Sequence, residues 1–268
     1  MRHILVGIAL ALTCVLVDTV AAHGVPLVVG GEPADQSYSF MTAVIHDGQQ
    51  HCGGALVHRD WVLTAAHCVL YYQDHPEELV KASVRVGSLD KAHGGAVRAV
   101  RRVVIHPDFH ATRRPNNDIA LIRLSAPVPY EPIPLSWWSP GDGTDTRLLG
   151  WGSTCSVPTG CVSPNVLRQF DTHVVSDTRC AVRPPQSSRP VLVHDPGTEF
   201  CTGNGDPAGV CFGDSGGPAL VGHYGQWRLA GVASRLTDLG GRCGLAPDIF
   251  TDTSVYLSWI YRTVFLGR

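Results

Sequence analysis

Short apolar segments recur along the whole chain, with clusters of Gly, Pro, Asp and Ser between them. This pattern predicts many short strands joined by turns, which is typical of an all-β sandwich or barrel. We expect strands at residues 40–45, 61–66, 82–86, 97–105 and 119–124 in the first half, and at 147–151, 168–175, 219–221, 227–233 and 249–251 in the second.

Two segments depart from this strand pattern. Residues 254–265 carry apolar side chains near helical spacing, after a Ser254 that can cap a helix. Residues 129–146 are rich in Pro, Gly, Ser and Asp, which is typical of a connection between two halves. The pattern therefore predicts two β-rich halves that meet near residue 140, with one C-terminal helix docked on them.

The N-terminal residues have the features of a secretory signal. A continuous apolar run extends from Ile4 to Val17, and Val20-Ala21-Ala22 supplies small residues for cleavage. The alternative, a buried N-terminal helix, would need a polar face, and none is visible. We expect residues 1–22 to be removed, and we find no later stretch long and apolar enough to cross a membrane.

Size and charge restrict the function further. About 245 residues remain after the signal, enough for one large β domain or two small lobes. The formal net charge is −2 at pH 7. Such a balance gives no reason to expect nucleic acid or an anionic membrane as a partner.

Cysteine usage indicates an oxidising compartment. The chain has nine cysteines, and Cys14 leaves with the signal. The even remainder predicts disulfides formed outside the cytoplasm. A zinc site is the competing interpretation, but no Cys-x-x-Cys pair exists, and we expect neither a metal nor a cofactor. The eight remaining cysteines are Cys52, Cys68, Cys155, Cys161, Cys180, Cys201, Cys211 and Cys243.

Three runs carry the candidate chemistry: Thr64-Ala65-Ala66-His67-Cys68, Asp118-Ile119-Ala120-Leu121 and Gly213-Asp214-Ser215-Gly216-Gly217-Pro218. A serine hydroxyl is a weak nucleophile, and Ser215 needs a base to take its proton. His67 suits that role, because a histidine titrates near pH 6.5. Asp118 can orient the imidazole, and the N–H groups of Gly213 and Ser215 can stabilise the oxyanion.

The order of these runs separates two hydrolase classes. Gly213-x-Ser215-x-Gly217 also fits the nucleophile elbow of α/β-hydrolases, which place the acid and then the histidine after the serine. Here His223 is the only later histidine, and no acidic residue precedes it after Ser215. Each run alone has a structural explanation, as a core histidine, a strand-end cap or a loop. Their joint occurrence in the order His, Asp, Ser favours catalysis.

With these motifs the chain resembles the trypsin/chymotrypsin family of secreted serine endopeptidases over residues 28–268. The resemblance implies two six-stranded antiparallel β-barrels, at about 28–140 and 141–268, with the triad in the cleft between them. The run Gly150-Trp151-Gly152-Ser153-Thr154-Cys155 is similar in style to actinobacterial members. The other matching runs are Val28-Val29-Gly30-Gly31, Cys52-Gly53-Gly54-Ala55-Leu56, Asn117–Leu121 and Ser258-Trp259-Ile260.

The resemblance also implies disulfides and an activation step. It pairs Cys52 with Cys68, Cys180 with Cys201, and Cys211 with Cys243, which leaves Cys155 and Cys161 to close a short loop. In the family a new N-terminal amine folds inward and pairs with the aspartate before the nucleophile. Here these groups are Val28 and Asp214, so residues 23–27 would be a propeptide. Leu27 precedes the cut, which argues against a trypsin-like activator.

The specificity pocket departs from trypsin. The family position that holds the trypsin aspartate is Gly209 here, whereas Asp248 replaces a family glycine on the opposite wall. We hypothesise that Asp248 lets the pocket accept Arg or Lys, alone or beside apolar side chains. The alternatives are that Asp248 is a turn residue, or that it pairs with Arg235 and closes the pocket. Val210, Phe212, Ser234 and Leu236 are the other expected substrate contacts, with Leu236 narrowing the entrance.

These expectations combine into a secreted serine endopeptidase that works through an acyl-enzyme. Its partners would be protein or peptide substrates and protein protease inhibitors, and the chain would be a monomer. Family members that bind calcium use acidic residues in the loop after Gly87, where residues 88–93 offer only Asp90. We therefore expect no calcium there. Two alternatives stay open: an inactive homologue kept as a binding module, and a secreted esterase.

Overall fold

The computed structural model describes residues 29–110, 116–156, 161, 163–181, 193–203, 208–222, 226–238 and 241–267. The expected signal, the expected propeptide and Val28 lie outside these residues. Within the described part, no helix has both the length and the apolar character needed to cross a membrane.

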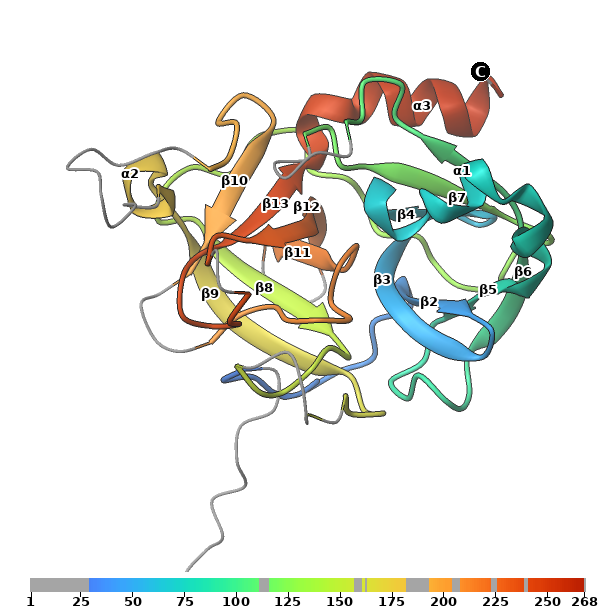
Figure 1. Ribbon diagram of the computed structural model, residues 1–268, viewed down its shortest axis with the longest axis horizontal. Helices are drawn as coiled ribbons and strands as arrows, with labels where there is room; N and C mark the ends of the chain where they lie inside the picture. Colours follow the sequence, from blue (N-terminus) through green and yellow to red (C-terminus); the bar gives the residue numbers. More distant parts are fainter. Residues whose placement is uncertain are drawn as a thin grey trace, which may run out of the picture.

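The first half forms a closed antiparallel barrel (Figure 1). Its strand order is β2-β3-β4-β7-β6-β5, and the barrel closes because β2 pairs with β5 as well as with β3. In β5 the buried side chains of Ala82, Val84 and Val86 alternate with half-buried ones, as expected of a strand with one face in the core. The strands are β2 (Met41–His46), β3 (Gln49–His58), β4 (Trp61–Thr64), β5 (Ala82–Val86), β6 (Ala96–Ile105) and β7 (Ala120–Leu124).

The second half forms another barrel, drawn beside the first in Figure 1. The order β9-β10-β13-β12-β11-β8 becomes a ring because β8 also pairs with β9. β1 (Glu32–Pro33) pairs with the first two residues of β9, before the part that pairs with β10. The all-β prediction is therefore confirmed, and so are the two six-stranded barrels implied by the resemblance. The strands are β8 (Asp145–Gly150), β9 (Arg168–Val175), β10 (Glu199–Thr202), β11 (Pro218–Val221), β12 (Arg228–Leu236) and β13 (Asp248–Asp252).

The C-terminal helix is present, but its start differs from the prediction. A 3-10 turn, η3 (Thr253–Tyr256), leads into α3 (Leu257–Phe265). The cap is Asp252, whose side chain accepts a hydrogen bond from the Ser254 amide at 2.9 Å. The prediction of Ser254 as the cap was therefore wrong, because the helical turn begins one residue before Ser254 and its side-chain cap is the Asp252 carboxylate. Figure 1 shows α3 extending from the second barrel across the top of the first.

Other helical turns are short. They are η1 (Ala66–Cys68), α1 (Tyr71–Asp74) and η2 (Pro76–Lys81) between β4 and β5, and α2 (Asp177–Cys180) after β9. Of these, η1 carries His67 and so contributes directly to the site.

One hydrophobic core continues from the first barrel into the seam between the barrels. It contains fully buried residues from both halves, among them Trp61, Trp151 and Leu229. A second cluster around Phe200 and Phe250, whose rings stack at 5.7 Å, fills the second barrel. The shared core holds the two barrels together, so residues contributed by both can form one site.

Strand β3 was not among the predicted strands, because its sequence contains two glycines and few apolar residues. The glycines are required by close approach. A Cβ on Gly53 would lie 2.8 Å from Gly217 Cα, and one on Gly54 would lie 2.7 Å from Val62 Cγ1. Since such contacts are too short for real atoms, Gly53 allows β3 to lie directly against the segment that follows Ser215.

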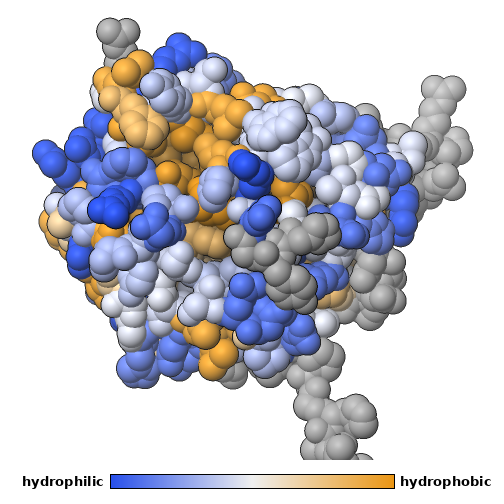
Figure 2. Space-filling model, turned by 180° about the vertical axis from the view of Figure 1, so that it is seen from behind, coloured by the Kyte–Doolittle hydropathy of each residue, from blue (hydrophilic) through white to orange (hydrophobic). Residues whose placement is uncertain are grey.

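Four disulfides join the pairs that the resemblance implied: Cys52–Cys68, Cys155–Cys161, Cys180–Cys201 and Cys211–Cys243. The first ties β3 to the residue after His67, and the last ties the segment before Ser215 to the loop before β13. On the outer surface, Figure 2 shows an apolar area on the face opposite the view of Figure 1, with hydrophilic residues around it.

Candidate active site

Asp118 lies at the base of the site, just before β7. Asn117 adopts a left-handed φ of 51°, and its side chain donates to Asp108 O and accepts from Tyr256 Oη, both at 2.9 Å. Asparagine is among the few residues that tolerate this conformation. The turn directs Asp118 inward, where its side chain is 0% exposed.

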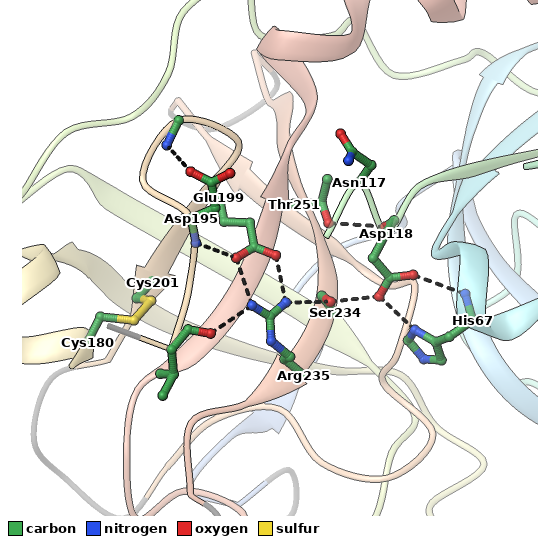
Figure 3. A network of polar contacts seen from close by, with 12 residues as sticks. His67, Asn117, Asp118, Cys180, Asp195, Glu199, Cys201, Ser234, Arg235 and Thr251 are labelled. Carbon is green, nitrogen blue, oxygen red and sulfur yellow. Dashed lines mark hydrogen bonds and ion pairs between the residues drawn. A yellow bond between two sulfur atoms is a disulfide. The ribbon is translucent and has the colours of Figure 1, made fainter. Parts of the chain in front are cut away.

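His67 lies on η1, directly after β4, and faces Asp118. Its Nδ1 is 2.8 Å from Asp118 Oδ2, and its backbone N–H donates to Oδ1 at 3.0 Å. Two residues of the second barrel complete the arrangement, since Ser234 Oγ donates to Oδ2 at 2.6 Å and Thr251 Oγ1 donates to Asp118 O at 3.0 Å (Figure 3). Asp118 therefore fixes one edge of the imidazole and leaves Nε2 on the opposite edge.

The electrostatics keep Asp118 charged. Burial raises the pKa of this carboxyl, but the hydrogen bonds from His67 and Ser234 and the attraction of His67 outweigh it, and the net pKa is lowered. A charged carboxylate at Nδ1 favours the tautomer with its proton on Nδ1, which leaves Nε2 as the basic nitrogen.

Ser215 is half-buried and lies on the segment that packs against β3. Gly53 N donates to Ser215 O at 2.7 Å. The next residue, Gly216, has a φ of 77°, and a Cβ there would lie 2.2 Å from Thr64 Oγ1 and 3.1 Å from Ala65 N. The serine segment thus touches the residues immediately before His67. Among the described contacts no hydrogen bond joins the Ser215 and His67 side chains, and such catalytic bonds are often long in unliganded sites.

Two carbonyl groups around Ser215 are held by the surrounding backbone. Ser153 N donates to Phe212 O, and Gly217 N donates to Asp214 O, both at 2.8 Å. In a trans peptide the C=O and N–H point in opposite directions, so these bonds direct the N–H groups of Gly213 and Ser215 away from the barrel. Neither amide donates to a backbone carbonyl among the described residues, so both can bind a ligand.

Asp214 is buried behind this turn, with 1% of its surface exposed. Its Oδ1 accepts from Gly152 N at 2.7 Å, and its Oδ2 accepts from Cys211 N at 2.9 Å. Burial raises the pKa of Asp214 to about 6, although these amides and the charge of Lys91 oppose the rise. Val28, the partner expected from the resemblance, lies outside the described residues.

A pocket of about 220 Å³ opens beside Ser215. Four of the expected substrate contacts line it, and the prediction did not include Cys211, Ala233 or Arg235 as lining residues. Gly209 and Asp248, the two remaining expected contacts, are not part of its lining. The pocket is lined by Val210, Cys211, Phe212, Ser215, Ala233, Ser234, Arg235 and Leu236.

Asp248 lies against Gly209 and contacts the pocket wall at Val210. Its Oδ2 accepts from Val210 N at 2.9 Å, and a Cβ on Gly209 would lie 2.2 Å from the same oxygen. The carboxylate of Asp248 therefore occupies the space that a side chain at position 209 would take. Its Oδ1 is buried and has no hydrogen-bond partner among the described residues, and burial raises the pKa of Asp248 well above its ordinary value.

Both alternatives for Asp248 are wrong. It is not a turn residue, because it begins β13 and pairs with Leu236 and Thr202. Nor does it pair with Arg235, which binds Glu199 on β10 instead, at 2.6 Å and 2.8 Å to the two carboxylate oxygens.

This Arg235–Glu199 ion pair was not predicted. Glu199 is fully buried, and its carboxylate also accepts from Asp195 N at 2.9 Å. Figure 3 shows the pair next to Ser234, whose Oγ lies 3.3 Å from Arg235 Nη1. A lone glutamate in a short apolar strand is the only signal that the sequence offers for this partner.

The described residues contain two groups close enough to hold a metal ion: Cys52, His67 and Cys68, and Cys180, His194 and Cys201. In both groups the two cysteines form a disulfide. A disulfide offers no thiolate, which is the form of cysteine that binds metal. Neither group therefore fits a metal centre. In the loop expected to lack calcium, Asp90 Oδ1 accepts hydrogen bonds from Ala92 N and His93 N.

Comparisons with known proteins agree with this geometry. The family model described as Trypsin matches residues 28–260. Human serine protease 41 is 32% identical over 258 residues, which cover 89% of this chain and 76% of that protein. The structure of mouse neuropsin, a serine protease, superposes with a TM-score of 0.70 at 27% identity and covers 87% of this chain and 98% of neuropsin. These relatives are mammalian and do not support the expected actinobacterial style.

Proposed function

Because the chain belongs to the trypsin family of serine endopeptidases, we propose that His67, Asp118 and Ser215 hydrolyse peptide bonds through an acyl-enzyme. His67 Nε2 takes the Ser215 proton as Oγ attacks the carbonyl, and the imidazolium then gives that proton to the leaving amine. In the second half of the reaction His67 takes a proton from water as the water attacks the acyl-enzyme ester. The proton then returns to Ser215 Oγ, and the carboxylic acid product is released. Asp118 stabilises the imidazolium, and Gly213 N and Ser215 N stabilise the oxyanion.

The observation that carries this proposal is the double hydrogen bond between Asp118 and His67, next to the contact between Gly53 and Ser215 O. These contacts place an imidazole hydrogen-bonded to a buried carboxylate and the half-buried Ser215 at the same seam. The inactive homologue and the esterase are the competing functions.

A fluorophosphonate probe tests the proposal, because it reacts only with an activated serine. We expect labelling of the mature chain, loss of labelling in Ser215→Ala, and digestion of casein by the wild type. A folded chain that is not labelled would indicate an inactive homologue. Labelling and ester hydrolysis without casein digestion would indicate an esterase.

We infer that the chain is exported and then activated. The disulfides favour a secreted enzyme. Removal of residues 1–22 and then of 23–27 would expose the Val28 amine, and the buried Asp214 requires such a cation. The mature enzyme would be a monomer that binds substrates and protein inhibitors. N-terminal sequencing of active enzyme should begin at Val28, and a start at His23 would contradict the activation step.

For specificity we propose that Asp248 selects Arg or Lys at P1. Its carboxylate accepts from the N–H of Val210, which lines the pocket, and its other oxygen is without a hydrogen-bond partner among the described residues. A basic side chain would satisfy that oxygen and keep the carboxyl charged. The apolar walls of the pocket, such as Ala233 and Leu236, allow apolar side chains to bind as well.

A further inference from the structure

Lys91 lies half-buried at the seam between the barrels, in the loop that joins β5 to β6. The loop is anchored by backbone contacts with the second barrel. Lys91 N donates to Asn165 O at 2.9 Å, and Leu167 N donates to Leu89 O at 2.6 Å. Arg85 Nε holds the Lys91 carbonyl at 3.0 Å. The first barrel thus delivers a cation to a fixed place on the second.

From this place the ammonium reaches the oxyanion turn by two routes. In the first, Lys91 Nζ lies 3.4 Å from Trp151 O, and the N–H of the same peptide unit, Gly152 N, donates to Asp214 Oδ1 at 2.7 Å. A cation and a carboxylate therefore bind opposite ends of one peptide group, and each polarises that group in the direction that strengthens the other bond.

The second route passes through Gln50. Lys91 Nζ lies 3.2 Å from Gln50 Oε1, and Gln50 Nε2 donates to Gly213 O at 2.7 Å. The ammonium is therefore one bridging group away from Gly213 and from Asp214. The oxyanion N–H groups lie in the 212–213 and 214–215 peptide planes, and Gly213 and Asp214 each contribute to one of these planes.

The charges around Asp214 favour the same relation. Burial opposes the charged form of this carboxyl, and Lys91 is the described cation that stabilises it. Among the described residues, Asp248 is an acidic group close enough to interact with Asp214, and Asp90 lies near Lys91. Burial also lowers the pKa of Lys91, while Asp214 and Asp90 raise it. The ammonium and the Asp214 carboxylate thus stabilise each other in a region that excludes water.

We propose that Lys91 is a positioning residue for hydrolysis, which acts as an internal counter-ion of Asp214 and braces the 213–214 turn in the form that stabilises the oxyanion. The proposal rests on the proposed roles of Ser215, Gly213 N and Ser215 N. It adds a cation from the first barrel to the Val28 amine expected after activation.

The test uses the mature enzyme with Lys91→Met, Lys91→Arg and a matched control. Lys81 is the only other lysine of the chain, and it pairs with Glu78 on the surface with 47% of its side chain exposed. In Lys91→Met we expect kcat to fall about tenfold, with a smaller change in KM. This fall in kcat is smaller than the fall expected when an oxyanion donor itself is removed. The acidic limb of the kcat profile should move upward by about half a pH unit, because Asp214 loses its cation.

Lys91→Arg should restore the acidic limb, and Lys81→Met should leave both quantities unchanged. If Lys91→Met does not fold, Lys91→Gln, which keeps a hydrogen-bond donor without the charge, replaces it. A charge-free variant at position 91 with the wild-type kcat and acidic limb would overturn the proposal. A wild type that the fluorophosphonate does not label would instead overturn the proposed function on which it rests.

Discussion

Asp118 and Asp214 are both buried at the seam, yet their surroundings have opposite effects. Asp118 accepts hydrogen bonds from His67 and Ser234, and its pKa is lowered. Among the described residues Asp214 accepts only from the amides of Gly152 and Cys211, and burial raises its pKa to about 6. Hydrogen bonds to the charged form offset the cost of burial in the first case and leave part of it in the second.

Asp248 extends this comparison, because burial raises its pKa as well, and within the described part of the chain one of its oxygens has no hydrogen-bond partner. The region around Asp118 is complete within the described chain. Asp214 and Asp248 are two carboxyls that a cation would stabilise. For Asp214 the cations are Lys91 and the Val28 amine, and for Asp248 the cation is a basic side chain of the substrate. Asp118 thus keeps a base oriented, whereas Asp214 responds to activation and Asp248 to the substrate.

The largest effect should come from replacing the Asp118 carboxylate that orients His67. In Asp118→Asn we expect kcat to fall by about 10⁴-fold, because an amide no longer favours the imidazole tautomer with a basic Nε2. Stopped assays with an ester reporter at neutral pH measure this loss, with circular dichroism to check the fold. A loss of less than about tenfold would show that Asp118 does not orient the base.

Removing the charge of Asp248 should change selectivity rather than the chemical step. In Asp248→Asn the ratio of kcat/KM for Arg over Phe reporter peptides should fall roughly 100-fold, because a buried guanidinium would lose its partner. The exposed Asp145 at the start of β8 supplies the control Asp145→Asn, for which we expect no change. An unchanged Arg preference in Asp248→Asn would refute this role.

The unfavourable burial of the Asp214 carboxylate should appear in the pH dependence of the free energy of unfolding. Asp214 has a raised pKa in the folded chain, so between its ordinary value of 3.8 and about 6 the folded state keeps a proton that the unfolded state has lost. Stability contributed by this group therefore falls as pH rises through that window, by roughly 3 kcal/mol at most.

Urea unfolding of the chain beginning at His23 measures this slope against Asp214→Asn. We expect the wild type to lose stability relative to the variant from pH 4 to pH 7. If the free energies of unfolding of the wild type and Asp214→Asn changed with pH in parallel, the destabilisation assigned to the Asp214 carboxylate would be contradicted. In the chain beginning at Val28 the difference should shrink, because the free amine stabilises the carboxylate.

The smallest effect should come from removing one of the hydrogen bonds to Asp118. Ser234→Ala removes one hydrogen bond to Asp118, so we expect kcat to fall about tenfold. Ser136→Ala is the matched control, since this buried serine donates to Trp138 O, outside the described site contacts. Equal activities of the two variants would show that Ser234 makes no contribution through Asp118.

Much of this architecture could be predicted from local pattern. The alternation in β5, the limits of β9 and the helical spacing of α3 are properties of short segments, and the three catalytic motifs occur as contiguous runs. Strand β3 escaped because Gly53 and Gly54 meet atoms of Val62 and Gly217. The reason for those glycines exists only after the chain has folded.

The sequence by itself determined which chemical groups are present: a histidine, two acidic residues next to key motifs, a serine and an even set of cysteines. Tertiary structure alone decided their partners. Arg235 reaches Glu199 rather than Asp248, and Lys91 meets Trp151 and Gln50 across the seam. Partner choice depends on distances between segments far apart in sequence and on the water that burial removes, and neither quantity is encoded in any single stretch of residues.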